Sequence, residues 1–340
     1  MNIFMKFRFV CNYFIFFLVL LFFMNFSYSA FVNINSCNIS LSGGNYYNLT
    51  SNISIGGTSC FVFTGSDAVF ECNGYTIDGN DTIATTAFGF GDGSTHNISV
   101  QNCVITDFYW AYSSSQNDYM KILNSSFVSN NYGINLFSVN SQRLVIENVN
   151  LNNNLGIGLS AQYLVYSIIK NVSANYNGQD GFYFYNSDYN NISDVNSNYN
   201  NRYGLYITRS SNRNIINDSD FRFNDNLNFY LPYDFSAANQ NLFYNNYFGN
   251  YSKISGDWAL NTPNNFNKST LGNYYLYLPE NSTQICFDVP TNLTCDYGPL
   301  FDPYTPVVLS SSNGLALLPF LNIFSLFIIF FSGFFYFIFS

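Results

Sequence analysis

Aliphatic residues in the middle of the chain recur at nearly constant intervals. One position of the repeat holds Val100, Ile122, Ile146, Ile169, Ile192 and Ile216. Two residues after each of these stands Asn or Asp, with spacings of 22, 24, 23, 23 and 24 residues, at Asn102, Asn124, Asn148, Asn171, Asp194 and Asp218. A fixed repeat of this length predicts a solenoid, because each unit buries its apolar side only against its neighbours.

Within each repeat, apolar residues alternate with small or polar ones at a period of two. The alternating pairs are Ile134/Leu136, Ile157/Leu159, Phe182/Phe184 and Leu205/Ile207, and a glycine precedes each pair, at Gly133, Gly156, Gly181 and Gly204. This alternation predicts short, half-buried strands, and the flanking Asn, Asp and Gly residues suit tight corners. Three strands and three corners in about 23 residues predict one coil of an all-β, single-stranded right-handed parallel β-helix.

The predicted β-helix assigns a place to each column of the repeat. We expect about eight coils between residues 60 and 250, with the aliphatic column inside and the asparagine columns at corners. A second asparagine column, six residues after the first, holds Asn130, Asn154, Asn177, Asn200 and Asn224. Stacked amides in such columns can hydrogen-bond from coil to coil. A leucine-rich repeat is excluded by the absence of its L-x-x-L-x-L pattern, and a β-sandwich does not keep a fixed register of this kind.

The two ends of the chain are the longest apolar stretches. Residues 1–29 begin with Lys6 and Arg8, continue as an apolar run and end in small residues, which predicts a signal peptide cleaved after Ser29. An uncleaved signal anchor is the alternative. Residues 315–340 carry no charge and are long enough to cross a bilayer, so we expect a retained transmembrane anchor rather than a lipid-exchange signal.

These assignments divide the chain into five parts. The signal peptide is followed by an N-terminal cap over residues 30–60, the β-helix repeats over 61–250, and a C-terminal cap or irregular stalk over 251–310, before the anchor at 315–340. The sequence therefore predicts an exported protein, held at the cell surface by the membrane through its C-terminal helix, with the β-helix outside.

The charge of the chain and its few potential metal ligands limit the kinds of partner and cofactor that it can bind. The chain has 11 basic and 20 acidic residues, and two of the basic ones precede residue 30, so the remainder carries 9 − 20 = −11. Such a surface repels phosphate backbones, which excludes nucleic acid as a partner. The single histidine, His96, and the absence of a C-x-x-C motif argue against a metal site, and no cofactor is predicted.

Six cysteines remain after the predicted signal peptide, and an even number in an exported chain favours disulfides. The pairs closest in sequence are Cys37–Cys60, Cys72–Cys103 and Cys286–Cys295, although six cysteines allow about 15 connectivities. Asn-x-Ser/Thr sequons are compatible with glycosylation of an exported protein, and the candidates are Asn38, Asn97, Asn171 and Asn292.

Segments outside the central repeat resemble known proteins. CNGYTIDG, from Cys72 to Gly79, resembles the opening coil of the secreted right-handed β-helix repeat family, which includes NosD-like periplasmic proteins and carbohydrate-active β-helices with the pectin lyase-like fold. The stretch from Cys37 to Cys60 resembles the lead-in of archaeal surface members, and CFDVPTNLTCDYGPLFDPY resembles a degenerate form of their aspartate-rich tail. The resemblance implies the fold, but this fold supports several activities.

The carboxylates give little support for catalysis. Glycoside hydrolysis needs two carboxylates across a sugar, and a lyase needs a base. The paired aspartates, H-G and R-x-K of polygalacturonase-like enzymes are missing. The best cluster comprises Asp180, Asp188, Asp194, Asp218 and Asp220 with Arg202, Arg209 and Arg213. Because Asp194 and Asp218 share a column with Asn, we interpret them as corner residues.

Aromatic and arginine residues form rows that are candidates for glycan binding. The position three before each Ile holds Tyr119, Arg143, Tyr166, Tyr189 and Arg213, and alternation predicts that these side chains point outward from the strand. A second outward row holds Phe137, Tyr183, Tyr185 and Tyr206. Aromatic faces and planar donors suit sugar rings and hydroxyls. Abundant tyrosine that merely stiffens exposed strands is the plainer interpretation.

The sequence therefore predicts a surface-anchored β-helix without catalysis that binds glycans or cell-surface polysaccharide, or that serves as a structural component of the envelope. The alternative is a divergent polysaccharide lyase or hydrolase of the pectate-lyase-like class.

Overall fold

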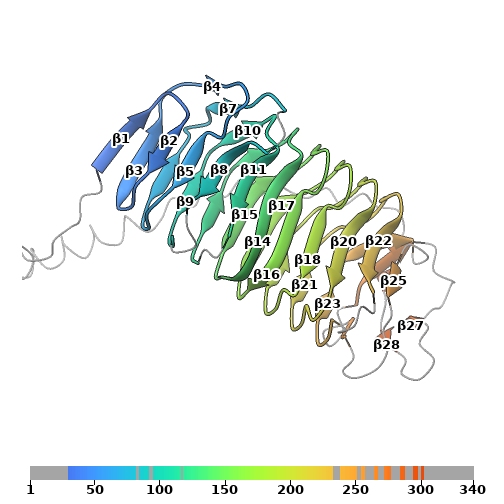
Figure 1. Cartoon of the computed structure of the whole chain (residues 1–340). Coiled ribbons are helices and arrows are strands. Elements are labelled where there is room, and N and C mark those ends of the chain that lie inside the picture. The colour runs from blue at the N-terminus through green and yellow to red at the C-terminus, as the bar shows by residue number, and fades with distance from the viewer. Residues whose placement is uncertain are drawn as a thin grey trace, which may run out of the picture. The chain divides into compact units, whose positions relative to one another are not determined.

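The described part of the chain is a stack of β-coils. The computed structural model describes residues 30–81, 84–91, 95–115, 118–232, 238–250, 254–256, 264–266, 272–276, 284–287, 294–297 and 300–301. These residues form an all-β, right-handed parallel β-solenoid of about nine coils, whose strands run side by side from one end of the stack to the other (Figure 1). The fold class expected from the repeat is therefore confirmed.

Each coil contributes a strand or a single bridged residue to each of three faces. Face 1 is the first branch of a 14-stranded sheet and consists of β1 (Ala30–Ile34), β3 (Asn45–Leu49), β6 (Val69–Glu71), β9 (Ser99–Gln101), β12 (Lys121–Leu123), β15 (Val145–Asn150), β17 (Ile168–Ser173), β19 (Asn191–Ser193), β21 (Ile215–Asn217) and β23 (Leu242–Tyr244). Neighbouring strands are parallel, as in the pairing of β15 with β17.

Face 2 begins with β4 (Ile53–Ser54), β7 (Thr76–Asp78), β10 (Val104–Thr106) and β13 (Ser126–Phe127). The ends of β15 and β17 continue it, because these strands bend around the corner from face 1. Single bridges through Asn196 and Asp220 carry the pairing to Tyr247. There β24 (Tyr247–Asn250), β26 (Tyr274–Leu276) and β29 (Leu300–Phe301) complete the face.

Face 3 is a ten-stranded parallel sheet. Its strands are β2 (Ile39–Leu41), β5 (Phe61–Phe63), β8 (Thr86–Phe90), β11 (Trp110–Ser114), β14 (Tyr132–Gln142), β16 (Leu159–Val165), β18 (Phe182–Tyr185), β20 (Tyr203–Thr208), β22 (Leu227–Leu231) and β25 (Ile254–Gly256). Its register corrects one detail of the repeat. Ile134 pairs with Leu159 rather than with Ile157, so the column glycine is Gly158 and not Gly156. A period-two pattern fits equally well when it is shifted by two residues.

The interior is lined by continuous apolar columns. The predicted column runs through Val100, Ile122, Ile146, Ile169, Ile192 and Ile216, all of which are buried and in register. Phenylalanines replace the aliphatics at the N-terminal end, where Phe61, Phe70 and Phe88 pack with ring centroids 4.7–5.5 Å apart. Burial of each such side chain contributes about 1.5–3 kcal/mol, so the columns supply much of the driving force for stacking.

The two predicted asparagine columns differ in environment. The second column is inside: Asn154 Oδ1 accepts the backbone N–H of Asn130 at 3.0 Å, Asn177 Oδ1 that of Asn154 at 2.9 Å, and Asn200 Oδ1 that of Asn177 at 2.9 Å. The first column is exposed, and Asn148 and Asn171 donate through Nδ2 to the asparagine of the preceding coil. The inner ladder satisfies buried backbone groups that the turning chain leaves unpaired.

A third asparagine ladder, which the sequence analysis did not recognise, lies two residues before the interior Ile column. Ser167 N–H donates to Asn190 Oδ1 at 3.0 Å, Asn190 N–H to Asn214 Oδ1 at 2.9 Å, and Asn214 N–H to Asn241 Oδ1 at 2.9 Å. All four side chains are buried. The constant offset from the Ile column was the available signal.

Each corner of the coil requires one residue in the left-handed conformation. At the corner between faces 1 and 2 these are the Asn and Asp residues of the first column, with φ of 47–57° from Asn102 to Asp218. The corner between faces 3 and 1, and the corner between faces 2 and 3, each have a comparable column. There the residues change from Asp and Asn in the N-terminal coils to Tyr, Phe and Arg further along. Bulky residues are uncommon at positive φ, which makes these two corners the unusual surfaces of the molecule.

Two of the predicted disulfides are present, Cys37–Cys60 and Cys72–Cys103, with Cα atoms 4.4 Å and 4.8 Å apart. Both link neighbouring coils at the N-terminal end. Cys286 and Cys295 are register partners in the antiparallel pair β27 (Gln284–Phe287) and β28 (Thr294–Tyr297), and their side chains lie outside the described residues.

The predicted signal peptide and membrane anchor, at 1–29 and 315–340, lie outside the described residues. In the part of the chain that is described, no helix has the length and apolar character to cross a bilayer.

Candidate functional site

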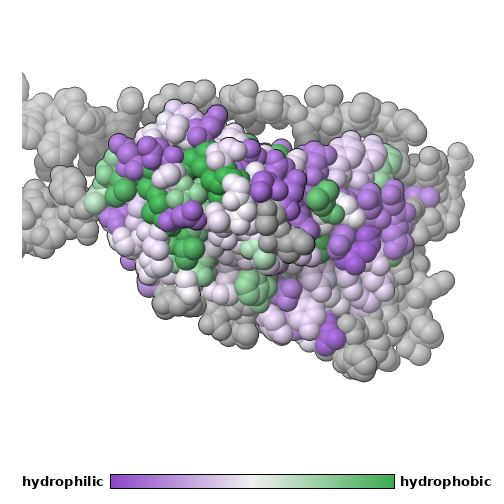
Figure 2. Space-filling view, turned by 45° about the horizontal axis from the view of Figure 1, so that its top comes forward, coloured by the Kyte–Doolittle hydropathy of each residue, from purple (hydrophilic) through white to green (hydrophobic). Residues whose placement is uncertain are grey.

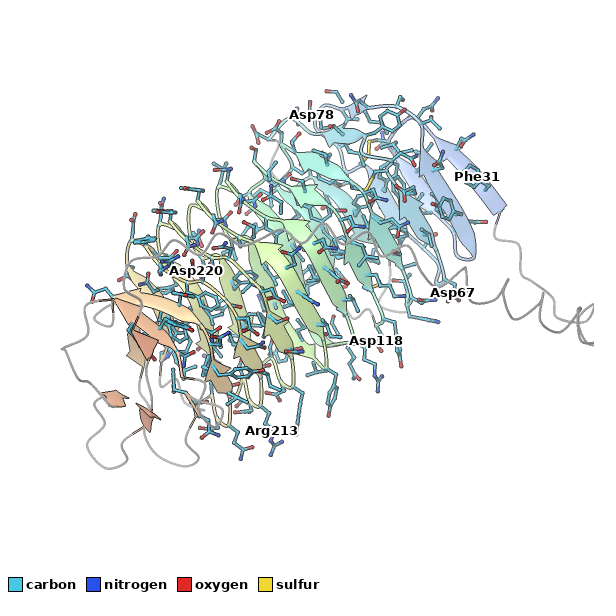
Figure 3. The ribbon with its side chains drawn as sticks, turned by 180° about the vertical axis from the view of Figure 1, so that it is seen from behind. Phe31, Asp67, Asp78, Asp118, Arg213 and Asp220 are labelled. Atoms are coloured by element: carbon cyan, nitrogen blue, oxygen red, sulfur yellow. A yellow bond between two sulfur atoms is a disulfide. The ribbon has the colours of Figure 1, made fainter. Side chains whose placement is uncertain are left out.

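The five residues predicted as an outward row lie together along the corner between faces 3 and 1, which we call corner 3-1. Tyr119, Arg143, Tyr166, Tyr189 and Arg213 all have positive φ, of 53–58°. The prediction that they belong to the strand is wrong, because each lies two residues before a strand begins. They are nonetheless exposed, Tyr166 by 53%. Arg213 marks this edge of the stack in Figure 3, together with Asp67 and Asp118 of the more N-terminal coils.

Stacking between coils determines which ring faces remain open. The rings of Tyr166 and Tyr189 are 4.9 Å apart and inclined by 20°, so each covers one face of the other. Arg213 closes the far face of Tyr189, with its guanidinium 5.2 Å from the ring centroid, and also donates to the Tyr189 hydroxyl. A row of exposed rings therefore presents mainly ring edges, and only the ends of a stack offer a full face to a ligand.

The remaining face of Tyr166 borders a cavity. Arg143, which occupies this column in the preceding coil, turns away from Tyr166: its guanidinium lies 5.3 Å from the Tyr119 ring centroid, and Nη1 donates to the Tyr119 hydroxyl at 2.9 Å. The space left between Arg143 and Tyr166 is a cavity of about 350 Å³ lined by Arg143, Leu144, Val145, Tyr166 and Ile168. Val145 and Ile168 are register partners on face 1.

The cavity combines an apolar wall with a donor of hydrogen bonds. Ile168 is 45% exposed, and together with the Tyr166 ring it offers apolar surface to a ligand. A guanidinium carries five N–H donors, and the contact with Tyr119 uses one of those of Arg143. An apolar pocket with a few directed polar groups is the usual composition of a small-ligand site.

Charge along this side of the stack is mixed rather than acidic. Four exposed cations lie on face 1 and corner 3-1, namely Lys121, Arg143, Lys170 and Arg213. The acidic residues of the same region are Asp67, Asp118 and Asp188 at corner 3-1 and Glu71 and Glu147 on face 1. Burial raises the pKa of Asp188, and the Asn212 N–H and Arg213 oppose that shift. In a chain of net charge −9, this grouping makes the corner less repulsive to an anionic sugar than the protein as a whole.

The second predicted row lies on face 3. Tyr183, Tyr206 and Tyr230 are register partners on β18, β20 and β22, with centroids 5.1 Å and 5.2 Å apart. Phe137 is exposed, whereas Tyr185 is half-buried and lies beneath the guanidinium of Arg209 at 5.4 Å. Burial, followed by the neighbouring tyrosines, raises the pKa of Tyr183 to about 12.

An ion pair lies among the face 3 tyrosines. Asp180 is fully buried, and Arg202 engages both of its oxygens, with Nε to Oδ1 at 2.6 Å and Nη2 to Oδ2. The backbone N–H of Tyr203 donates to Oδ1 at 3.2 Å. The Arg202 guanidinium also lies 5.2 Å from the Tyr203 ring and 5.8 Å from the Tyr206 ring.

The carboxylates grouped in the sequence analysis do not form one cluster. Asp194 and Asp218 are exposed at the corner between faces 1 and 2, and Asn245 donates to Asp218 as one more member of that ladder. Asp220 lies on face 2, paired with Arg222. Over the described ranges, no group of three His, Cys, Asp or Glu side chains is placed to hold a metal ion.

The glycosylation candidates and a further aromatic row are also exposed at corners of the coils. Three of the glycosylation candidates, Asn38, Asn97 and Asn171, are exposed at corners with positive φ, and Asn292 lies outside the described residues. An exposed aromatic row that the sequence analysis missed lies at the corner between faces 2 and 3. Its members, Tyr176, Tyr199 and Phe223, each follow the interior Ile by seven residues, and this constant offset could have revealed the row.

Comparisons with known proteins find similar folds among solved structures and one matching family region. No curated protein matches the chain. Among solved structures, the A-module of mannuronan C-5 epimerase AlgE6 from Azotobacter vinelandii is similar with a TM-score of 0.51 and 15% identity, over 71% of this chain and 78% of that one. The AlgE4 A-module from the same organism has a TM-score of 0.48 and 13% identity, over 71% and 76%.

A third similar structure is the DFA-IIIase from Arthrobacter chlorophenolicus A6 in complex with GF2, with a TM-score of 0.42 and 13% identity, over 71% of this chain and 62% of that one. At these identities the likeness concerns the fold alone. Residues 110–271 match the family described as right handed beta helix region, and these residues include coils with the register described above. The chain therefore contains a right-handed β-helix repeat region.

Proposed function

We propose that this protein binds a glycan at corner 3-1, with one sugar ring stacked on the open face of Tyr166 and its polar substituents bound by Arg143. The observation that carries the proposal is the cavity of about 350 Å³ that opens between these two side chains. A pyranose ring has an apolar face and a rim of hydroxyls, which match the Tyr166 ring and the guanidinium donors respectively.

The backbone conformation at corner 3-1 is unfavourable for the bulky side chains that stand there, which indicates that these side chains have a role. Tyr and Arg occupy left-handed positions that Asp67 and Asn97 fill in the N-terminal coils. Placing a bulky residue in this conformation costs of order 1 kcal/mol of stability per site. Such residues are therefore favoured only where stacking or ligand binding offsets that cost. A purely structural role for the row is the competing explanation, because stacked rings also stabilise neighbouring coils.

Exposure to glycans requires the protein to be outside the cell. We propose export through residues 1–29 and retention at the cell surface through residues 315–340, on the strength of their sequence. The resemblance of the cysteine-bounded N-terminal segment to archaeal surface β-helix proteins and of Cys72–Gly79 to NosD-like proteins supports the same placement. A structural component of the envelope would share this location but would bind no free oligosaccharide.

One observation favours the alternative of a divergent polysaccharide lyase or hydrolase, namely the buried Asp180 beside Arg202 and several tyrosines on face 3. The geometry weakens it. Both oxygens of Asp180 are engaged by Arg202, and raised pKa values disfavour the phenolate forms of Tyr183 and Tyr206. A general base needs a free lone pair within reach of the substrate. Degradation of a polysaccharide by the wild type that Asp180→Asn abolishes would establish the enzyme alternative instead.

The test compares matched substitutions on one column of face 1. Full-length protein is screened on an array of neutral and acidic oligosaccharides, and the best ligand is titrated by calorimetry. Ile168→Arg places a long cation in the cavity, and we expect at least about tenfold weaker binding. Ile215 has the same outward orientation two strands further along and lies outside the cavity, so Ile215→Arg should bind like the wild type.

Tyr166→Ala and Tyr189→Ala distinguish binding on the open face of Tyr166 from a general effect of the aromatic row. Tyr166→Ala should remove binding, because it deletes the stacking surface itself. Tyr189→Ala should weaken binding less, because Tyr189 supports Tyr166 from behind and does not line the cavity. Equal binding by wild type, Ile168→Arg and Tyr166→Ala would disprove the proposed site.

A further inference from the structure

A second aromatic stack follows the opposite edge of the coils, at the corner between faces 2 and 3, which we call corner 2-3. The rings of Tyr176 and Tyr199 are 5.0 Å apart and inclined by 4°, and those of Tyr199 and Phe223 are 5.3 Å apart and inclined by 15°. All three side chains are exposed, by 57%, 47% and 48% in chain order. In Figure 3, Asp220, which lies on face 2 close in sequence to Phe223, is seen on the side of the stack away from Arg213.

The backbone at this corner is as unusual as at corner 3-1. Tyr176, Tyr199 and Phe223 have φ of 57–61°, and the same column in the preceding coils is filled by Asp81, Asp107, Ser129 and Asn153. Small polar residues adopt this conformation at low cost, whereas aromatic residues rarely do. Three successive aromatic residues here, in place of small polar ones, indicate that the rings themselves are required.

As in the Tyr166–Tyr189 stack, one end of this stack is covered by a guanidinium and the other end is open. At the C-terminal end, the guanidinium of Arg222 lies 5.3 Å from the Phe223 ring centroid, held by its ion pair with Asp220. At the N-terminal end, the column continues with Asn153, whose side chain is shorter than an aromatic one, and Tyr176 is the most exposed ring of the three, at 57%. One end is closed by a cation, and the other presents a ring face.

Asn153 is joined at this end by uncharged residues. Leu155, two positions further along the chain, is 69% exposed and adds apolar surface. Asn152 accepts the Asn175 N–H through Oδ1 at 2.6 Å, which leaves its amide donors. The N-terminal end of the stack therefore offers a ring face, an aliphatic side chain and amides, without a charged residue among Asn152, Asn153, Leu155 and Tyr176.

We propose that the open face of Tyr176 is a second sugar-binding site, independent of the cavity at corner 3-1 and suited to a neutral pyranose. In a β-1,4-linked glucan the hydroxyls are equatorial, so both faces of each ring are apolar and stack on an aromatic ring, while the hydroxyls reach amides at its rim. Two sites on opposite edges of the coils let one protein hold two glycan chains at once.

Hydropathy alone does not reveal either site. On the face shown in Figure 2, hydrophobic residues gather toward the N-terminal coils, while tyrosine is drawn in pale colours because its hydropathy is intermediate. Both sites are defined by the geometry of their aromatic rings and not by a hydrophobic surface patch.

The test places a cation at the open end of the stack. Full-length protein is titrated with cellohexaose by calorimetry, and the background variant Ile168→Arg removes the site at corner 3-1. In this background we expect one remaining binding event. Adding Asn153→Arg should weaken it at least about tenfold, because Ser129 in the preceding coil offers no ring and the new guanidinium therefore stacks on Tyr176. Arg is tolerated in this conformation at Arg143 and Arg213.

Ser129→Arg is the matched control. Ser129 has the same φ, the same column and the same exposed position, but it lies two coils from Tyr176, so Ser129→Arg should leave binding unchanged. Circular dichroism and thermal melting report whether each variant folds. If Asn153→Arg fails to fold, Tyr176→Ala supplies the same test, because it removes the stacking face itself and should cause the same loss.

The outcomes distinguish the two proposed sites. Cellohexaose binding that survives both Asn153→Arg and Tyr176→Ala would overturn the second site. Complete loss of binding in Ile168→Arg alone would also overturn it while supporting the site at corner 3-1. Cellohexaose binding that is insensitive to Ile168→Arg but lost in Asn153→Arg would support the second site and show that cellohexaose does not occupy the cavity at corner 3-1.

Discussion

Asn171 and Asn177 are six residues apart and belong to the two predicted asparagine columns, and the same substitution should destabilise the protein at Asn177 but not at Asn171. Asn177 is 1% exposed: its Oδ1 accepts the Asn154 N–H, and its Nδ2 donates to Asn200 Oδ1 at 3.0 Å. Asn177→Asp removes that donor and places a carboxylate against an acceptor oxygen. Desolvation raises the pKa of such a buried carboxyl by about 3–5 units, so the charge costs about 4 kcal/mol at pH 7.

Asn171 is exposed, and its column already contains Asp194 and Asp218. Asn171→Asp should therefore change the unfolding free energy by less than about 0.5 kcal/mol. Urea denaturation followed by circular dichroism at pH 7 measures both variants. In protein produced without N-glycosylation, so that loss of the Asn171 sequon has no effect, the comparison holds residue type and charge change constant, and the difference isolates burial and the inner ladder.

The pH dependence gives a second check of the same reasoning. The introduced carboxyl has a folded-state pKa above its unfolded value of about 4, so its penalty is absent below pH 4 and grows as pH rises through the folded pKa. The deficit of Asn177→Asp should therefore shrink at pH 4, where the protonated carboxyl can donate to Asn200. Equal losses in the two variants, or a deficit in Asn177→Asp that persists at pH 4, would refute the assignment of an inner hydrogen-bonded ladder.

Four further predictions address the core, the N-terminal coils and the topology. The buried hydroxyl of Tyr112 has no hydrogen-bond partner, so Tyr112→Phe should raise the unfolding free energy by about 1–2 kcal/mol in urea titrations, and a loss would show that the hydroxyl is satisfied. Ile169→Asp buries an unpaired charge in the interior column and should abolish the β-sheet signal in circular dichroism; a folded variant would place Ile169 elsewhere. Burial, contact with Asp78 and nearby negative charge raise the pKa of Asp107 to about 6, so the folded state binds this proton more tightly, and stability should fall as pH rises from about 4 to 6. Solvent screening limits the effect to about 1 kcal/mol, and Asp107→Asn should flatten the thermal melting profile across that range, whereas an unchanged profile would assign the effect to other groups. Deleting residues 315–340 should release the protein into the medium, and persistence in the membrane fraction would indicate an uncleaved anchor at the N-terminus.

The repeat was enough to predict the coils because it encodes buried positions directly. The Ile column and the inner asparagine column face the interior of the stack. Every coil must fill the same apolar space and satisfy the same buried backbone groups there, so the same residue recurs. The Cys37–Cys60 and Cys72–Cys103 pairs followed from proximity in sequence, since residues one coil apart are neighbours in space, and the two pairs are separated by 23 and 31 residues of chain.

The corners were harder to predict because their backbone is unusual. Period-two counting extended the strand back to Tyr166 and Tyr189, although β17 begins at Ile168 and β19 at Asn191. Tyrosine and arginine give no turn signal, because they seldom occupy the left-handed conformation that these corners require.

The candidate site depends on a contact that a linear pattern does not contain. The sequence placed Tyr166 and Arg143 in one exposed row, but the open ring face arises because Arg143 turns toward Tyr119 while Tyr189 covers the other side of Tyr166. Exposure of a side chain is predictable from its position in the repeat, whereas the covering of each ring face depends on which neighbour a flexible arginine selects.

The most direct test of the proposed function is a crystal structure of the protein with the oligosaccharide that binds best on the array. We predict a sugar ring parallel to the open face of Tyr166, with a hydroxyl or carboxylate within hydrogen-bond distance of the Arg143 guanidinium. A sugar bound instead on face 3, beside Asp180 and Arg202, with corner 3-1 empty, would contradict the account and favour an enzyme.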